Sequence, residues 1–266
     1  MDIVEIFGYA GALSIGLVLG LIGGGGSILT VPILVYALSL NPVIATAYSL
    51  FVVGTTSLVG AVKNMIKGRV DFKTAIIFAI PAFTAVYLTR AFLIPAIPDE
   101  LFQVGDFMVT KNLTIMLFFA FIMLLASVTM IRNNKQQLDT KAKKINLLLL
   151  IAQGFFIGLV TGMIGAGGGF LIIPALVLLA KLPMKRAVAT SLFIIAINSL
   201  IGFLGDVQTY DIDWTFLLLF TSISIVGIFI GIWLNKFIDG KKLKKGFGWF
   251  VLVMGIYIIY KEIAKQ

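Results

Sequence analysis

The chain has no cysteine and no histidine in its 266 residues. Disulfide bonds, thiolate chemistry and histidine-ligated metals are therefore excluded. Charged residues are also scarce: Asp, Glu, Lys and Arg together make up 12% of the chain, against about 25% in a typical soluble domain. So few charges could not cover a surface that faces water.

Apolar residues are abundant instead, at 60% of the chain, and they give it a mean hydropathy of +1.08. They form continuous runs of about 20 residues, the length that a helix needs to cross a bilayer. A transmembrane β-barrel would show apolar residues in alternation. The sequence therefore predicts an all-α polytopic membrane protein, with the lipid bilayer as its surroundings.

Basic residues outnumber acidic ones, and the formal net charge is +9. A nucleic-acid partner is not expected, because most of the basic residues lie in a few loops between apolar segments. Loops 63–73, 132–144 and 236–245 are basic, whereas loops 95–111 and 205–213 are acidic. Basic loops stay on the cytoplasmic side of a membrane, so the N-terminus is predicted to lie outside.

One stretch of the sequence occurs twice, 142 residues apart. GLIGGGGSILTVP at 20–32 matches GMIGAGGGFLIIP at 162–174, and roughly 40% of the positions between 15 and 72 are identical to their partners. This is far above chance for an internal repeat. The chain is therefore predicted to consist of a first repeat unit at 1–131, a basic cytoplasmic linker at 132–144 and a second unit at 145–266.

The first apolar run, from Ile3 to Leu40, is interrupted only by four glycines. As one straight helix it would be about 55 Å long, against a hydrocarbon core of about 30 Å. Because glycine is a poor helix former, the helix is expected to break there and to turn back into the membrane as a short helix. Each unit is predicted to be such a re-entrant hairpin followed by three spanning helices. The expected hairpin arms are 3–22 with 27–38 and 145–164 with 170–181, and the expected spans are 42–62, 72–94, 112–131, 184–204, 213–236 and 246–261.

The two units are predicted to be inverted in the membrane. Loop 63–73 is basic, yet its equivalent in the second unit, loop 205–213, is acidic. Equivalent loops therefore lie on opposite faces. Inverted repeats with broken helices are typical of secondary transporters, and the breaks indicate where the substrate binds.

The two glycine clusters are the first candidate binding residues. The first N–H groups of a helix have no partner within the helix, and they carry the positive end of its dipole. Glycine has no side chain, so an anion could approach this backbone closely. The alternative is that the glycines only allow helices to pack tightly. The candidate substrate-binding residues are Gly23, Gly24, Gly25, Gly26, Ser27, Gly165, Gly167, Gly168 and Gly169.

Polar side chains on the following helix of each unit are the second candidates. Ser49 and Thr56 are two helical turns apart and share a face, and Ser191 and Asn198 repeat this spacing. Their hydroxyl and amide groups could complete the hydration shell of an anion. The alternative is that they form hydrogen bonds between helices.

Ionisable residues are nearly absent from the predicted spans. Arg90 could attract anions or pair with the acidic loop 95–111, and we expect an anchoring role for it. No carboxylate is expected at mid-depth, since Asp206 is placed at a helix end, so the coupling ion of a transporter is not visible. No cofactor and no enzyme activity are expected: the glycine clusters lack the Lys-Ser/Thr ending of a P-loop, and no span holds a pair of carboxylates.

The doubled glycine segment with its trailing proline, and the motifs ATAYSLF at 45–51 and AVATSLF at 187–193, resemble the sulfite exporter TauE/SafE family of membrane permeases. The resemblance covers nearly the whole chain. It implies export of a small sulfur-containing anion, such as sulfite or an organosulfonate, across the bacterial inner membrane. An anion channel of the same architecture and a membrane scaffold without transport are the alternatives. The chain could also form a homo-oligomer.

The predicted topology can be tested with single cysteines, because the chain has none of its own. We expect the variants Asp99→Cys and Lys141→Cys to react with a membrane-impermeant maleimide from opposite faces, since one loop is acidic and the other basic. Labelling of both from the same face would contradict the inverted arrangement.

Overall fold

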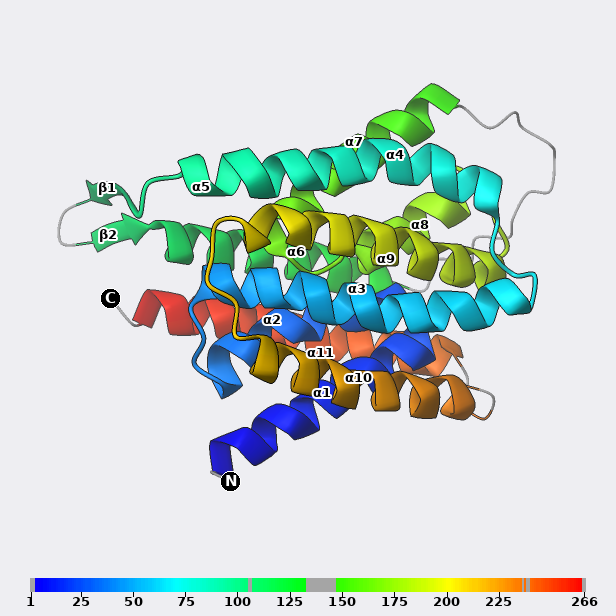
Figure 1. The fold of residues 1–266 in the computed structure, drawn as a ribbon, viewed down its shortest axis with the longest axis horizontal. Helices are drawn as coiled ribbons and strands as arrows, with labels where there is room; N and C mark the ends of the chain where they lie inside the picture. The colour runs from blue at the N-terminus through cyan, green and yellow to red at the C-terminus, as the bar shows by residue number, and fades with distance from the viewer. Residues whose placement is uncertain (1–2, 105–106, 133–146, 236, 238–239, 265–266) are drawn as a thin grey trace.

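The computed structural model describes residues 3–104, 107–132, 147–235, 237 and 240–264. Nearly all of them are helical, and most of the long helices lie side by side in one bundle (Figure 1). The long helices are α1 Ile3–Ile22, α3 Pro42–Ile66, α4 Phe72–Leu88, α6 Lys111–Ile131, α7 Leu147–Ile164, α8 Gly169–Leu178, α9 Met184–Val207, α10 Trp214–Leu234 and α11 Gly240–Ala264. The short elements are η1 Gly24–Leu29, α2 Thr30–Pro32, η2 Ile33–Ala37, η3 Thr89–Leu93, α5 Ile94–Ala96, β1 Glu100–Val104 and β2 Phe107–Thr110.

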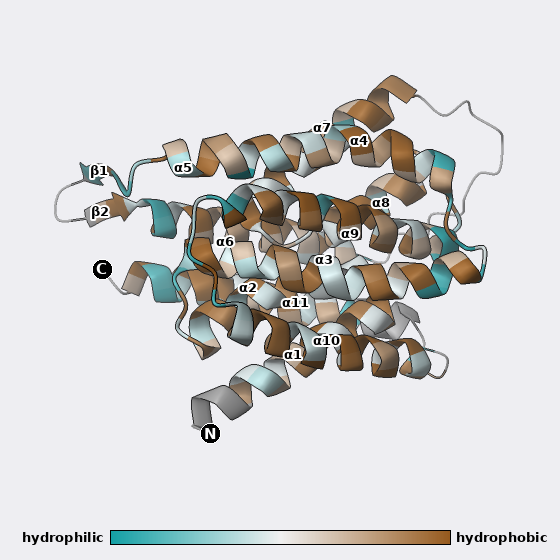
Figure 2. Ribbon diagram, viewed as in Figure 1, coloured by the Kyte–Doolittle hydropathy of each residue, from teal (hydrophilic) through white to brown (hydrophobic). Residues whose placement is uncertain are grey.

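Within the described residues, seven helices are long and apolar enough to cross a membrane. Apolar residues cover the middle of the helices, and hydrophilic residues gather towards their ends and in the connections (Figure 2). The prediction of a polytopic helical membrane protein is confirmed. Three of the spans, α3, α4 and α10, begin at a local cap: the side chains of Asn41, Asp71 and Asp213 accept hydrogen bonds from backbone N–H groups of the first turn, which have no partner within the helix.

The region between α5 and α6 differs from the all-α prediction. β1 and β2 pair there as an antiparallel hairpin, with Phe102 opposite Val109 and Val104 opposite Phe107. Two short segments rich in β-branched and aromatic residues favour strand pairing where no helix is forced by burial. The acidic loop 95–111 is therefore partly a β-hairpin outside the main bundle (Figure 1).

The helices have nearly the predicted bounds, with a few extensions. α3 runs to Ile66 and α9 to Val207, a few residues beyond the expected ends, and α11 begins at Gly240 instead of 246. Each first helix ends where predicted, at Ile22 and Ile164. The short helix of the first unit is built from three pieces, η1, α2 and η2, which follow one another without a gap from Gly24 to Ala37.

The two units contact each other in matched pairs. α1 packs on α10 at Gly16, where an added Cβ would collide with the carbonyl oxygen of Ser224. The equivalent contact places α7 on α4, where an added Cβ at Gly158 would collide with the carbonyl oxygen of Ala82. Gly16 and Gly158, like Ala82 and Ser224, are 142 residues apart. One contact is therefore made twice, with the units exchanged.

A hydrogen bond repeats the same exchange. The backbone N–H of Asp213 donates to the Tyr48 hydroxyl at 2.7 Å, and the backbone N–H of Asp71 donates to the Thr190 hydroxyl at 3.0 Å. Both donors and both acceptors are separated by the repeat offset of 142 residues. Each unit thus fixes the start of a helix in the other unit.

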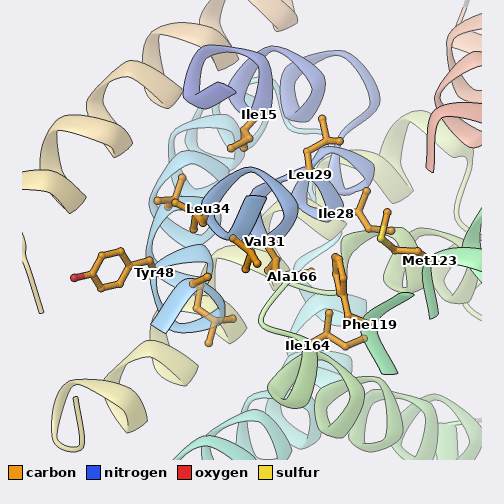
Figure 3. Close-up of a cluster of buried hydrophobic side chains, with 14 of the residues drawn as sticks. Ile15, Ile28, Leu29, Val31, Leu34, Tyr48, Phe119, Met123, Ile164 and Ala166 are labelled. Carbon is orange, nitrogen blue, oxygen red and sulfur yellow. The ribbon is translucent and has the colours of Figure 1, made fainter. Parts of the chain in front are cut away.

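The largest cluster of buried side chains joins the two units around the short helix of the first. Figure 3 shows Val31 of α2 in the same cluster as Ile164 and Ala166, which flank the glycine Gly165, and Phe119 of α6 lies close by. Apolar packing therefore holds the two glycine segments together in the interior.

The connections are sorted to the two ends of the bundle. The N-terminus, the C-terminus, the β1–β2 hairpin and the α9–α10 connection lie at one end, and the α3–α4 connection lies at the other (Figure 1). The acidic loops 95–111 and 205–213 are therefore at one end and the basic loop 63–73 is at the opposite end.

The exchanged helix contact gives a stability prediction. Gly158→Ala should lower the melting temperature in detergent, because its Cβ meets backbone of α4 that cannot rotate away, and overpacking of this kind costs about 1–3 kcal/mol. The control is Gly246→Ala on α11, where an added Cβ has no described atom within 4 Å. It should be neutral or slightly stabilising, because alanine favours helix. Equal melting temperatures for the two variants would contradict the close crossing.

Candidate binding site at the two glycine breaks

The backbone of both breaks is left-handed, which explains why glycine occupies them. φ is +78° at Gly23 in the first break, and +72°, +64° and +65° at Gly165, Gly167 and Gly168 in the second. A side chain disfavours this region by about 1–2 kcal/mol per residue. The turns also begin alike, because the N–H of Gly23 donates to Leu19 O and the N–H of Gly165 donates to the carbonyl oxygen of Thr161, both at 2.8 Å.

The two breaks touch each other. An added Cβ on Gly24, at the start of η1, would collide with Gly169, at the start of α8, and the reverse also holds. Ile195 contacts both Gly24 and Gly167, and it is the twelfth of the 24 residues of α9. The meeting point of the breaks is therefore at mid-length of a spanning helix.

Several polar side chains around the breaks are buried with no hydrogen-bond partner among the described residues. The Thr161 hydroxyl lies beside Gly168, and the Ser199 hydroxyl lies beside Gly167. Ser49 and Ser57 have unpartnered hydroxyls, and Asn198 has neither its amide oxygen nor its amide nitrogen paired. A buried unsatisfied polar group costs about 1–3 kcal/mol. Each of these groups requires a partner that the described residues do not supply, such as an ordered water, an ion or a ligand.

Other predicted residues have partners. The Ser27 hydroxyl donates to Gly24 O at 2.8 Å, and the Ser191 hydroxyl donates to Val188 O at 2.9 Å. The Thr56 hydroxyl donates to Ser224 Oγ on α10 at 3.2 Å. For Thr56 the alternative of a hydrogen bond between helices is therefore the one observed. Its equivalent Asn198 has no such bond.

The remaining glycines divide between packing and turn formation. Gly26 lies against the backbone of α1 at Leu19, so it serves close packing. Gly23 faces the side chain of Val188, close to the start of α9. Gly25 lies within η1, and its surroundings are outside the described contacts.

Arg90 has a different partner from the one expected. Its side chain is completely buried and forms an ion pair with Asp206 of α9, with 3.4 Å between Nη1 and Oδ2. The acidic loop 95–111 is not its described partner. Nη1 also donates to the Thr46 hydroxyl at 3.0 Å. Removing one partner alone from a buried pair typically costs about 3–5 kcal/mol, because the other charge is then buried without compensation.

This ion pair adjoins the second glycine break. An added Cβ on Gly165 would lie 2.6 Å from Arg90 Nη2. Asp206 lies at a helix end as expected, since α9 ends at Val207, but its burial against Arg90 was not anticipated. Helix α9 reaches past Asp206, and the folded chain brings α4 and α9 together at this point.

Two residues of the site were not anticipated from the sequence. Thr161 and Thr46 are buried polar residues within apolar runs. Their repeat equivalents, Leu19 and Val188, are apolar. A polar residue where the other unit is apolar is the signal that could have identified them.

The space beside the second break is closed. It is lined by Val160, Thr161, Ile164, Ala166, Gly168, Phe170 and Leu171, and it does not admit a water molecule. A ligand could enter this space only if the side chains that line it moved.

Comparison with known proteins gives one family and several relatives. The family model described as "Sulfite exporter TauE/SafE" matches residues 9–258. A probable membrane transporter protein of Xylella fastidiosa is 28% identical over 94% of this chain and 93% of its own. The probable membrane transporter protein YunE of Bacillus subtilis is 27% identical over 93% of this chain and 94% of its own. Over a shorter stretch, 42% of this chain and 44% of its own, the probable membrane transporter protein MJ0441 of Methanocaldococcus jannaschii is 38% identical. No solved structure matches.

The unpartnered hydroxyls give a stability prediction. Thr161→Val keeps the shape and removes a buried group without a partner, so it should raise the melting temperature by about 2–4 °C for each 1 kcal/mol recovered. The control is Thr221→Val on α10, whose buried hydroxyl donates to Leu217 O at 2.7 Å. That variant should be neutral or destabilised. Destabilisation of Thr161→Val by as much as the control would show that its hydroxyl has a structural partner.

Proposed function

The chain belongs to the sulfite exporter TauE/SafE family, and on that premise we propose that it is a secondary transporter that exports a small anion. The substrate proposed is a sulfur oxyanion or an organosulfonate, moved across the inner membrane by alternating access. Relatives that match over more than nine-tenths of the chain are named membrane transporter proteins, and the seven apolar helices agree with a multi-pass membrane protein.

The observation that carries this proposal is the meeting of the two glycine breaks in the interior. η1 and α8 begin at the same point, with Gly24 against Gly169. Free N–H groups at a helix start favour an anion. The unpartnered Thr161 and Ser199 hydroxyls lie beside the same turn. Backbone donors, hydroxyl donors and the absence of side chains on glycine together suit a compact oxyanion.

The exchanged contacts support an inverted arrangement. The contact of Gly16 with α10 recurs as that of Gly158 with α4, as expected if a two-fold axis relates the units. The placement of loops 63–73 and 205–213 at opposite ends of the bundle (Figure 1) agrees with an axis that lies in the membrane plane. In transporters of this kind, one unit rocks against the other around a fixed central site.

The burial of the two breaks favours a transporter over a scaffold without transport. A scaffold without transport would place its glycine segments against lipid or partner helices. Here Gly24 and Gly169 are buried against each other, among polar groups that lack partners.

Ligand-dependent stability tests this function directly. We would measure the melting temperature of the purified protein with chloride, phosphate, sulfate, sulfite, thiosulfate and methanesulfonate at matched ionic strength. A ligand that binds the folded state stabilises it by about 2.7 kcal/mol at 100 times its dissociation constant. We expect a selective rise with at least one sulfur anion, and saturable counter-transport of that anion in proteoliposomes. A flat response to all six anions, without flux, would overturn the proposal.

A pair of glycine variants connects the binding to the break. Gly167→Ala places a Cβ 2.7 Å from Val53 and 3.1 Å from the Ser199 hydroxyl, at φ +64°. Gly68→Ala carries the same backbone strain at φ +61°, but its Cβ has no described atom within 4 Å. We expect the first to lose the anion-induced stabilisation and the second to keep it. Retention of the full effect in Gly167→Ala would remove the glycine break from the site.

A further inference from the structure

We propose that Arg90 binds the transported anion directly, and that Asp206 is a built-in competitor that occupies Arg90 while the carrier is empty. This inference rests on the proposed anion transport and adds a charged residue to its site. It also gives the site an internal anion that the substrate must displace.

The position of Arg90 is the first support. It lies in η3, a turn of π-helix inserted into the otherwise α-helical stretch from Phe72 to Ala96. Such insertions occur frequently at functional sites. Nη2 faces the positive-φ turn at Gly165, close enough that a Cβ there would lie 2.6 Å away. The guanidinium group therefore borders the same break whose backbone is proposed to bind the anion.

The incompleteness of the ion pair is the second support. The separation of 3.4 Å between Nη1 and Oδ2 is long, since charge-assisted hydrogen bonds of this type are about 2.7–2.9 Å. Neither oxygen of Asp206 has a hydrogen-bond partner among the described residues, and neither do Nε and Nη2 of Arg90. The pair thus gains attraction between charges without the two parallel hydrogen bonds that an arginine can form with a carboxylate.

The unused atoms of Arg90 form a suitable binding edge. Thr46 holds Nη1 from one side, so the edge made by Nε and Nη2 is left with its donors free. Arginine presents its donors in a rigid fork that matches two oxygens of one oxyanion. An oxyanion at the Gly165 turn could engage this edge and the free N–H groups of the break together. It would replace a loose carboxylate contact with a better one.

The position of Asp206 near a helix end would allow its carboxylate to move away from Arg90. Gly205 permits the close approach of α9 to Arg90, where an added Cβ would lie 3.0 Å from the Cβ of Arg90. α9 ends at Val207, and the next two residues, Gln208 and Thr209, are exposed. A displaced carboxylate therefore has a short way to water. While the substrate is absent, Asp206 neutralises a buried charge that would otherwise be costly.

The repeat does not produce a second copy of the group formed by Arg90, Asp206 and Thr46. The equivalents of Arg90, Asp206 and Thr46 are Ile232, Asn64 and Val188. One charged anchor per chain suits the binding of one anion per cycle, although the backbone breaks are doubled.

Three variants separate binding from structural support: Arg90→Gln, Asp206→Asn and the double variant Arg90→Gln/Asp206→Asn. Stability and sulfur-anion binding are measured by melting temperature, with the anion that shifts the wild type most strongly in the panel of sulfite, sulfate, thiosulfate and methanesulfonate. Arg90→Gln should melt lower, because Asp206 is left buried without its charge partner, and it should not respond to the anion. The double variant should recover much of the lost melting temperature and still not respond.

Asp206→Asn should bind the anion more tightly. The apparent dissociation constant falls as the fraction of carrier with a free binding group rises, and we expect a gain on the order of tenfold when the competitor is removed. Unchanged or weaker binding in Asp206→Asn would overturn the competitor role.

The controls distinguish failure of this inference from failure of the proposed function. Arg186→Gln/Asp71→Asn removes an ion pair of 3.9 Å whose side chains are 50% and 23% exposed, and it should respond to the anion as the wild type does. If the double variant of Arg90 and Asp206 regains both stability and the full response, the pair is structural only and this inference is overturned while anion transport stands. If the wild type responds to no anion, the proposed function fails first, and this inference fails with it.

Discussion

The structure depends on one close approach, that of Gly24 to Gly169. Neither residue can carry a side chain, because a Cβ on either would collide with the backbone of the other. A non-helical backbone at membrane depth is tolerated only where it is enclosed by protein or lines a cavity. The two breaks meet this requirement by enclosing each other, between the middle of α9 and the cluster that contains Val31 and Ala166 (Figure 3). The breaks, the short helices that follow them and the central packing of α3 on α9 are consequences of that contact.

Comparison of the two repeat units separates residues that serve the fold from residues that serve the proposed site. Contacts that fix the architecture are kept in both units: Gly16 and Gly158 at the helix crossings, and Asp71 and Asp213 at the helix starts. Polar groups near the breaks are not kept. The repeat equivalent of Thr161 is Leu19, and that of Arg90 is Ile232. A symmetric scaffold therefore carries an asymmetric set of donors, and the donors are concentrated at the break of the second unit.

The sequence predicted the fold well where local rules decide it. Apolar length and the glycine clusters indicated the spans and the breaks, because each acts within a few residues of the chain. The β1–β2 hairpin was missed, because its two strands have only five and four residues and give a weak signal beside long helices. The glycine part of the site was predicted for the same local reasons. The ion pair of Arg90 with Asp206 was not, because it joins residues that are 116 positions apart on two helices, and only the packing of α4 on α9 brings them together.

The interior around the breaks holds buried polar groups that have no partner among the described residues. A buried hydroxyl or amide without a partner destabilises a fold, and Thr161, Ser199 and Asn198 are kept in that condition within a few turns of the breaks. If the protein only needed to stay folded, apolar residues of the same size would serve better at these places. Donors that remain unused in the interior agree with the proposed transport of an anion, because an anion would supply acceptors to N–H and O–H groups that the protein does not satisfy by itself.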